Sequence, residues 1–265
     1  MSTCTGSGLP ASECRSNAAG DIGFGIGATM RSALDTWHAV ACAAIVLLTA
    51  SLAAAQPAPD AAPLPVVRSW VLSADELRGS GSTPPTHSLH LELAMVSGTR
   101  WKPDEILEAV RGAAKILDQC GIRVDAARLR EFDGPPRYRY LRTPDSRELA
   151  RRSGLSRPAV FFVDDTLQRP AFDAEAIGRG NAASRPEMMD SVWITAGIRD
   201  LPVALAHELA HVLADSGAHS DAPDNLMREE TTAANTRLAA GQCSAMRATG
   251  EAHGLLQRAP APARP

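Results

Sequence analysis

The sequence has few aromatic residues and no excess of charge of either sign. Phe, Trp and Tyr together make up 4% of its 265 residues, and 27 basic side chains nearly balance 30 acidic ones, which leaves a formal net charge of −3. Proteins that bind nucleic acid or anionic membranes through their surface charge need a basic excess, so we expect neither as a partner. The length is enough for one sizeable domain or two small ones.

The sequence also lacks an apolar run long enough to span a membrane. Its longest run, at 39–52, falls short of the about 20 residues that a transmembrane helix needs. Arg31 precedes the run and an Ala-x-Ala cleavage site at 53–55 follows it, which is the order of a secretory signal peptide. We therefore predict a signal peptide at 30–55 after a disordered or untranslated extension at 1–29, with a transmembrane anchor as the alternative. The mature protein would be periplasmic or secreted and have no stable membrane span.

Cysteine is scarce in the predicted mature protein. Of the five cysteines in the sequence, only Cys120 and Cys243 follow the predicted cleavage site. An even pair in an oxidising compartment indicates one disulfide, with two buried free thiols as the alternative. Such a bridge would close a long loop and tie the middle of the domain to its C-terminal segment.

The remaining chain predicts one domain with flanking extensions. Pro and Ala dominate 56–65, which we interpret as a linker, and residues 256–265 are interpreted as a disordered tail. The domain at 66–255 shows strand and helix patterns that predict an α+β fold, a twisted mixed sheet covered by helices. The expected strands are at 65–73, 88–96, 122–124, 129–132, 159–163 and 191–195, with 173–186 a loop or edge strand, and the expected helices are at 104–119, 146–153, 201–214 and 236–248.

The helix predicted at 201–214 contains the sequence His-Glu-Leu-Ala-His, from His207 to His211. Histidines four residues apart lie one above the other on a helix, so both imidazoles can bind one tetrahedral Zn²⁺ ion. Glu208 is placed to reach a water on that ion rather than the ion itself, which suits a general base. Three apolar residues on another side of the helix are expected to face the core: Leu205, Leu209 and Val212.

A catalytic zinc site normally has three protein ligands and one open position. Beyond the helix, Gly217 can adopt the left-handed conformation that ends a helix, and the chain can then turn back to present His219. Because histidine is a preferred zinc ligand, His219 is the predicted third ligand. Four acidic residues nearby remain alternatives: Asp215, Asp221, Glu229 and Glu230.

The segment from His207 to Met227 resembles the active-site motif of the metzincin clan of zinc metallopeptidases. That motif is H-E-x-x-H-x-x-G-x-x-H followed by a turn that contains methionine, and Met227 in Asn-Leu-Met looks like the methionine of that turn. The chain departs from the motif at Ala214, where the clan has glycine, and at Gly217, where the clan has its third histidine. His219 comes two residues later. The motif covers about a tenth of the chain.

The resemblance implies a metzincin-like zincin domain with an active-site helix and a C-terminal helix. It also implies an edge strand above the metal that pairs with the substrate backbone, for which 174–184 is the candidate region. The implied activity is that of an endopeptidase that binds Zn²⁺ and cleaves peptide or protein substrates with Glu208 as general base. The alternative is a secreted zinc-binding protein with a structural or adhesion role on the same scaffold. We expect the protein to be a monomer.

Overall fold

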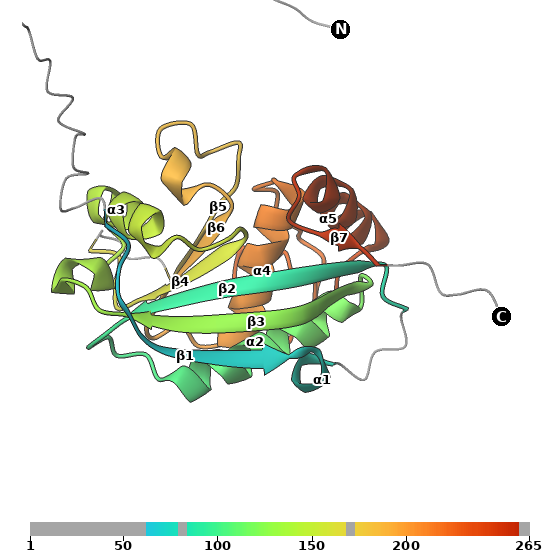
Figure 1. Cartoon of the computed structure of the whole chain (residues 1–265). Coiled ribbons are helices and arrows are strands. Elements are labelled where there is room, and N and C mark those ends of the chain that lie inside the picture. The colour runs from blue at the N-terminus through green and yellow to red at the C-terminus, as the bar shows by residue number, and fades with distance from the viewer. Residues whose placement is uncertain (1–61, 79–83, 168–172, 260–265) are drawn as a thin grey trace, which may run out of the picture. The chain divides into compact units, whose positions relative to one another are not determined.

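The structure is a computed structural model that describes residues 62–78, 84–167 and 173–259 (Figure 1). The predicted extension, the predicted signal peptide and most of the predicted linker lie outside these residues. No helix in the described part is long and apolar enough to cross a membrane.

The described residues contain the seven strands of one mixed sheet. The strands are β1 Val66–Ser73, β2 His87–Val96, β3 Ile122–Phe132, β4 Ala159–Val163, β5 Ala174–Ile177, β6 Ser191–Thr195 and β7 Gln257–Arg258. Six of them lie side by side in the order β1, β3, β2, β4, β6 and β5, and β7 pairs with the first residues of β2. The four central strands are parallel, whereas β1 and β5 run antiparallel to their neighbours at the two ends of this order.

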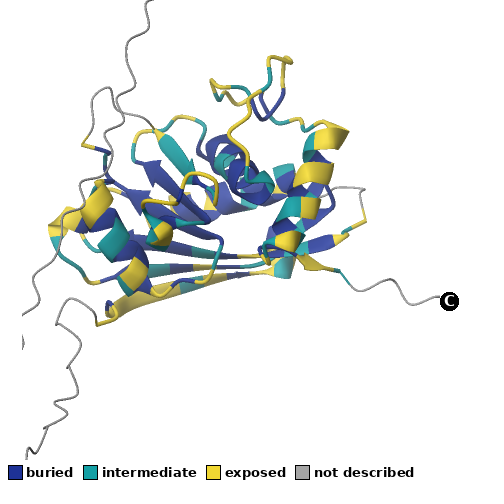
Figure 2. Ribbon diagram, turned by 90° about the horizontal axis from the view of Figure 1, so that it is seen from above, coloured by how far each residue is buried: buried dark blue, intermediate teal, exposed yellow. Residues whose placement is uncertain are grey.

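Helices lie on both faces of the sheet (Figure 1). They are α1 Ala74–Leu77, α2 Pro103–Asp118, α3 Thr143–Ser153, α4 Leu201–Ala214 and α5 Ala240–Ala252. Helices α2 and α4 pack on one face with α5 beside α4, and α3 packs on the other face. The side chains of β4 alternate between these faces: Val160 and Phe162 join the core with α2 and α4, while Phe161 and Val163 join the core with α3. The buried residues, dark blue in Figure 2, therefore lie in the strands and in the helix faces turned toward them.

The most apolar elements follow the sequence patterns closely. The strands at 159–163 and 191–195 and the helix at 201–214 are confirmed with the predicted bounds. Strand β4 is buried on both faces, so it consists of apolar residues throughout and its ends are sharp in the sequence.

The prediction of two short strands at 122–124 and 129–132 is wrong, because β3 is continuous from Ile122 to Phe132. The stretch at 125–128 contains Asp125 and Arg128, which hid the strand pattern. The guanidinium of Arg128 lies 3.6 Å from the carboxylate of Glu92 on β2, and that of Arg130 lies 3.0 Å from it, so charges on the sheet surface are paired between the two strands.

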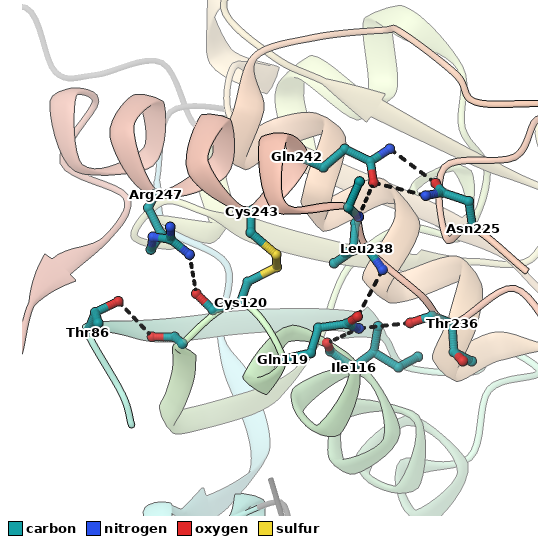
Figure 3. Close-up of a disulfide and its surroundings, with 12 residues drawn as sticks. Thr86, Ile116, Gln119, Cys120, Asn225, Thr236, Leu238, Gln242, Cys243 and Arg247 are labelled. Carbon is teal, nitrogen blue, oxygen red and sulfur yellow. Dashed lines mark hydrogen bonds between the residues drawn. A yellow bond between two sulfur atoms is a disulfide. The ribbon is translucent and has the colours of Figure 1, made fainter. Parts of the chain in front are cut away.

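The C-terminal helix was predicted four residues too early, at 236–248, and α5 begins at Ala240. The side chain of Gln119 explains the shift (Figure 3). Its amide nitrogen donates to the carbonyl of Thr236 at 2.8 Å, and its amide oxygen accepts the N–H of Leu238 at 2.8 Å. These bonds fix the residues from Thr236 to Leu238 in a non-helical conformation, so the helix starts only after them.

The folded domain also extends beyond both of its predicted ends. Leu64 is buried and its N–H donates to the carbonyl of Arg152 at 3.0 Å, so ordered structure begins before residue 66. Leu256 is buried and β7 follows it, so the tail predicted from residue 256 belongs to the fold as far as Ala259.

Cys120 and Cys243 form the predicted disulfide (Figure 3). The bond joins the chain just after α2 to α5, across a sequence separation of 123 residues. The side chain of Arg247, also on α5, donates to the carbonyl of Cys120 at 2.7 Å. Together these contacts fix α5 to the end of α2.

Candidate metal centre

Helix α4 is held firmly in the core. Asp200 occupies its N-cap position and Pro202 lies in its first turn. A Cβ atom built on Gly112 of α2 would lie only 2.6 Å from the Cβ of Pro202, so the two helices cross closely at a point where a larger residue does not fit. The three apolar residues that were expected to face the core are fully buried: Leu205, Leu209 and Val212.

His207, His211 and His219 come together in one cluster that could hold a metal ion, with one ring nitrogen from each residue within 4.8 Å of the other two. The ring centroids of His207 and His211 are 4.5 Å apart, and the centroid of His219 lies 5.4 Å and 4.9 Å from them. Among the described residues, none of the four acidic alternatives for the third ligand belongs to this cluster.

The two helical histidines have defined tautomers. The Nδ1 atom of His207 lies 2.7 Å from the carbonyl oxygen of Leu226, and the Nδ1 atom of His211 lies 2.6 Å from that of Ser216. A carbonyl only accepts, so both Nδ1 atoms carry the proton and donate. The two Nε2 atoms are therefore unprotonated in the neutral rings, and they face each other at 2.9 Å.

Burial keeps these two rings neutral. It lowers the pKa of His207, and it lowers the pKa of His211 to about 4, while the hydrogen bonds to the carbonyls partly offset both shifts. The neighbouring histidines lower both pKa values further, because positive charges on adjacent rings repel. A neutral imidazole is the form that binds metal ions.

Glu208 lines the same cavity as the three histidines, and its side chain is half-buried. Burial raises the pKa of its carboxyl group to about 8, the negative charge of Glu175 acts in the same direction, and a hydrogen bond with the backbone of Ala176 partly offsets them. A cation on the adjacent histidines would favour the ionised carboxylate and lower this pKa. The group can therefore become a proton acceptor when a cation is bound.

A turn at Asn225, Leu226 and Met227 contacts His207 through the backbone carbonyl of Leu226. The side-chain oxygen of Asn225 accepts the N–H of Met227 at 2.9 Å, which orders the turn and places the Leu226 carbonyl against His207. The amide of Gln242 on α5 makes two hydrogen bonds of 3.0 Å and 3.1 Å with the amide of Asn225 (Figure 3). Met227 itself is buried in the core. The sequence motif pointed to Met227, but it gave no signal for the roles of Asn225 and Gln242.

The left-handed residue that follows α4 is not the predicted one. Asp215, not Gly217, adopts the left-handed conformation, with φ of +46°, and it caps the helix. Its carboxylate accepts the N–H of Gly180 at 3.1 Å. A Cβ atom on Gly178 would lie 2.5 Å from the same carboxylate, so the close approach requires glycine there. Asp215 therefore braces the segment after β5 instead of binding metal.

The cluster opens into a cleft of about 630 Å³ between α4, the loop after it and the edge strand β5. Strand β5 occupies only Ala174–Ile177 of the candidate region at 174–184. The residues that line the cleft are Ala174, Glu175, Ala176, Gly178, Gly180, Asn181, His207, Glu208, His211, Asp215, Ser216, Gly217, His219 and Glu229. The strand, the histidines and Glu208 thus share one cavity.

The fold and the site together define a mixed α/β domain with one disulfide and a three-histidine candidate metal centre. Comparison of the chain with models of known protein families and with curated protein sequences gives no match. The function is therefore inferred from the geometry and chemistry of the site.

Proposed function

We propose that the chain is an exported zinc-dependent endopeptidase of metzincin-like type. One observation carries the proposal: the Nε2 atoms of His207 and His211 face each other at 2.9 Å while both Nδ1 atoms donate to carbonyls. Two lone pairs at this distance repel each other unless a cation binds to both. His219 supplies a third nitrogen, and Glu208 supplies a carboxylate beside the histidines.

The donor set suits Zn²⁺. Three imidazoles favour zinc over Mg²⁺ and Ca²⁺, which prefer oxygen ligands. Structural zinc sites are usually closed by four ligands and are rich in cysteine, whereas this cluster has three histidines and both cysteines of the described residues are bridged to each other. When bound, Zn²⁺ supplies Lewis acidity, which lowers the pKa of a water molecule and polarises a substrate carbonyl.

Glu208 acts as the proton carrier of the proposed reaction. It accepts a proton from the water as the water oxygen attacks the carbonyl carbon of the peptide bond. It then gives that proton to the nitrogen as the carbon–nitrogen bond breaks, so a carboxylic acid and an amine leave the site. The N–H of Ala176 on β5 keeps the carboxylate oriented toward the cleft.

The substrate backbone would lie along β5. This strand is the last in the order of the sheet, it runs antiparallel to β6, and its residues line the cleft beside Glu208. An extended peptide can add to such an edge through backbone hydrogen bonds. The disulfide and the predicted signal peptide support action in the periplasm or outside the cell, where we propose that the enzyme works as a monomer.

The test compares the mature protein with its Glu208→Gln variant, by elemental analysis of zinc and by cleavage of a peptide library. We expect one zinc per chain in both proteins and cleavage that is on the order of 1,000-fold slower in the variant. A zinc-binding protein with a structural or adhesion role would hold zinc and cleave nothing. A well-folded parent that takes up no zinc would refute the proposal at its first step.

A further inference from the structure

We infer that the cleft selects substrates with a lysine or arginine side chain beside the bond that is cut. This inference rests on the proposed function for the position of that bond. A second cavity of about 390 Å³ adjoins the first and shares Ala174, His207, Glu208 and Glu229 with it. A peptide that lies along β5 and reaches Glu208 passes beside this second cavity, because Ala174 and Glu208 line both.

The charge of the second cavity has one sign. Glu229, Glu230 and Asp173 line it, all three are exposed, and none of them forms an ion pair with a described residue. No lysine or arginine lines either cavity in the described part of the chain. Among the described residues, no basic side chain therefore competes with a ligand for these carboxylates.

The carboxylates of the first cavity provide a contrast. Glu175 lies 2.6 Å from the guanidinium of Arg185, and Asp215 accepts the N–H of Gly180. In the second cavity, Glu229, Glu230 and Asp173 form no ion pair with a described residue.

The apolar lining of the second cavity fits the rest of a basic side chain. Ile198 and Ala204 face it beside the carboxylates. Lysine and arginine bury their methylene stems against apolar surface and keep the charged group in a polar environment. A cavity with an aliphatic floor and an acidic rim therefore matches their chemistry better than that of an aliphatic or acidic residue.

The test uses labelled peptides in which one lysine moves along a neutral sequence, each with a counterpart that has norleucine at the same place. Norleucine keeps the stem and removes the charge. Binding to the Glu208→Gln protein is measured by fluorescence anisotropy at low salt, with and without added Zn²⁺. We expect the lysine peptide to bind about tenfold more tightly than its norleucine counterpart at one position, and this advantage should shrink at high salt.

The double variant Glu229→Gln/Glu230→Gln should lose most of that advantage. The matched control is Asp104→Asn/Glu105→Gln, which removes two exposed charges from the first turn of α2, away from both cavities. Equal binding of lysine and norleucine at every position overturns the inference. Full retention of the lysine advantage in the double variant overturns it as well.

Cleavage by the parent protein separates the inference from the proposed function. If lysine peptides bind preferentially but the parent cuts none of them, the cleft is selective and the endopeptidase proposal is wrong. If the parent cuts peptides with equal rates for lysine and norleucine at every position, the protein is an endopeptidase and the inference is wrong.

Discussion

Helix α4 and the segment 215–239 both contribute to the metal centre, but they are held in different ways. The helix has its own backbone hydrogen bonds, and most of its residues are buried. The following segment contains no helix or strand, only an isolated bridge between Asn225 and Arg237, and many of its residues are exposed. Its course depends on partners elsewhere, above all the side chains of Gln119 and Gln242.

This difference predicts that the helical histidines and His219 contribute unequally to metal affinity. The helix offers two buried rings with defined tautomers, so little order has to be gained when a metal binds. His219 is exposed and lies in the irregular segment, so some of its binding energy must offset the loss of conformational freedom. The helical pair should therefore dominate the affinity.

The largest expected effect on zinc affinity comes from removing one histidine of the helical pair. His211→Ala should weaken zinc binding by more than about 1,000-fold, whereas His219→Ala should weaken it by roughly 10- to 100-fold, because two preorganised ligands remain in the second case. Competition with a chromophoric chelator measures both affinities. Equal losses in the two variants would show that the loop ligand is as well ordered as the helix.

The second effect concerns pH in the metal-free protein. The pKa of His211 is about 4 in the folded protein and about 6.5 in an unfolded chain, so between these values the unfolded state binds more protons and stability falls as pH falls. Over the whole window the loss should reach roughly 3 kcal/mol. His207 acts in the same direction because its pKa is also lowered.

The titration of Glu208 changes stability with pH in the opposite direction. The measurement therefore uses a protein in which Glu208 is replaced. Its raised pKa means that the folded state holds a proton up to about pH 8, so its contribution to stability is lost as pH rises. Urea unfolding of the metal-free Glu208→Gln protein should therefore show a clear decline from pH 6.5 to pH 5. Adding His211→Gln should flatten the profile, whereas adding His219→Ala should make it only slightly shallower, because His219 is the smallest of the causes that lower the two pKa values. A flat profile before the second substitution contradicts the prediction.

The smallest effect compares two glutamines that hold the irregular segment. Gln242→Ala removes the partner of Asn225 and loosens the turn whose Leu226 carbonyl orients His207, so zinc affinity should fall about tenfold. Gln119→Ala breaks two bonds to the same segment, at Thr236 and Leu238 on either side of Arg237. The carbonyl of Arg237 accepts the N–H of Leu226 at 2.6 Å, so Gln119 acts on the turn only through this backbone bond, and zinc affinity should fall less, by about two- to threefold.

Thermal unfolding of the two glutamine variants shows whether a loss of zinc affinity comes from a change in the orientation of His207 or from general destabilisation of the fold. Both glutamine variants should lose about 1 kcal/mol of stability, because each removes side-chain hydrogen bonds. If zinc affinity follows stability equally in the two variants, Gln242 has no specific effect on His207.

The errors of sequence-based prediction fall where a partner distant in sequence decides the structure. Strand β3 was split at a stretch that includes Arg128, whose charge is paired with Glu92 on another strand, and the start of α5 was misplaced because Gln119 holds the preceding residues. The left-handed residue after α4 was placed at Gly217 because glycine favours that conformation, but Asp215 adopts it with its carboxylate bonded to the Gly180 N–H.

The sequence alone determined helix α4, the buried strands β4 and β6, the pairing of the two remaining cysteines and the two helical histidines of the candidate site. Each of these features depends on local periodicity or on the number of residues of one kind, and both can be seen in the sequence before the fold is known. Only the tertiary structure decided that His219 joins the cluster, that carbonyls of Leu226 and Ser216 set the tautomers, and that β5 borders the cleft. Those contacts connect separate segments, and their geometry exists only after the sheet and the helices have packed.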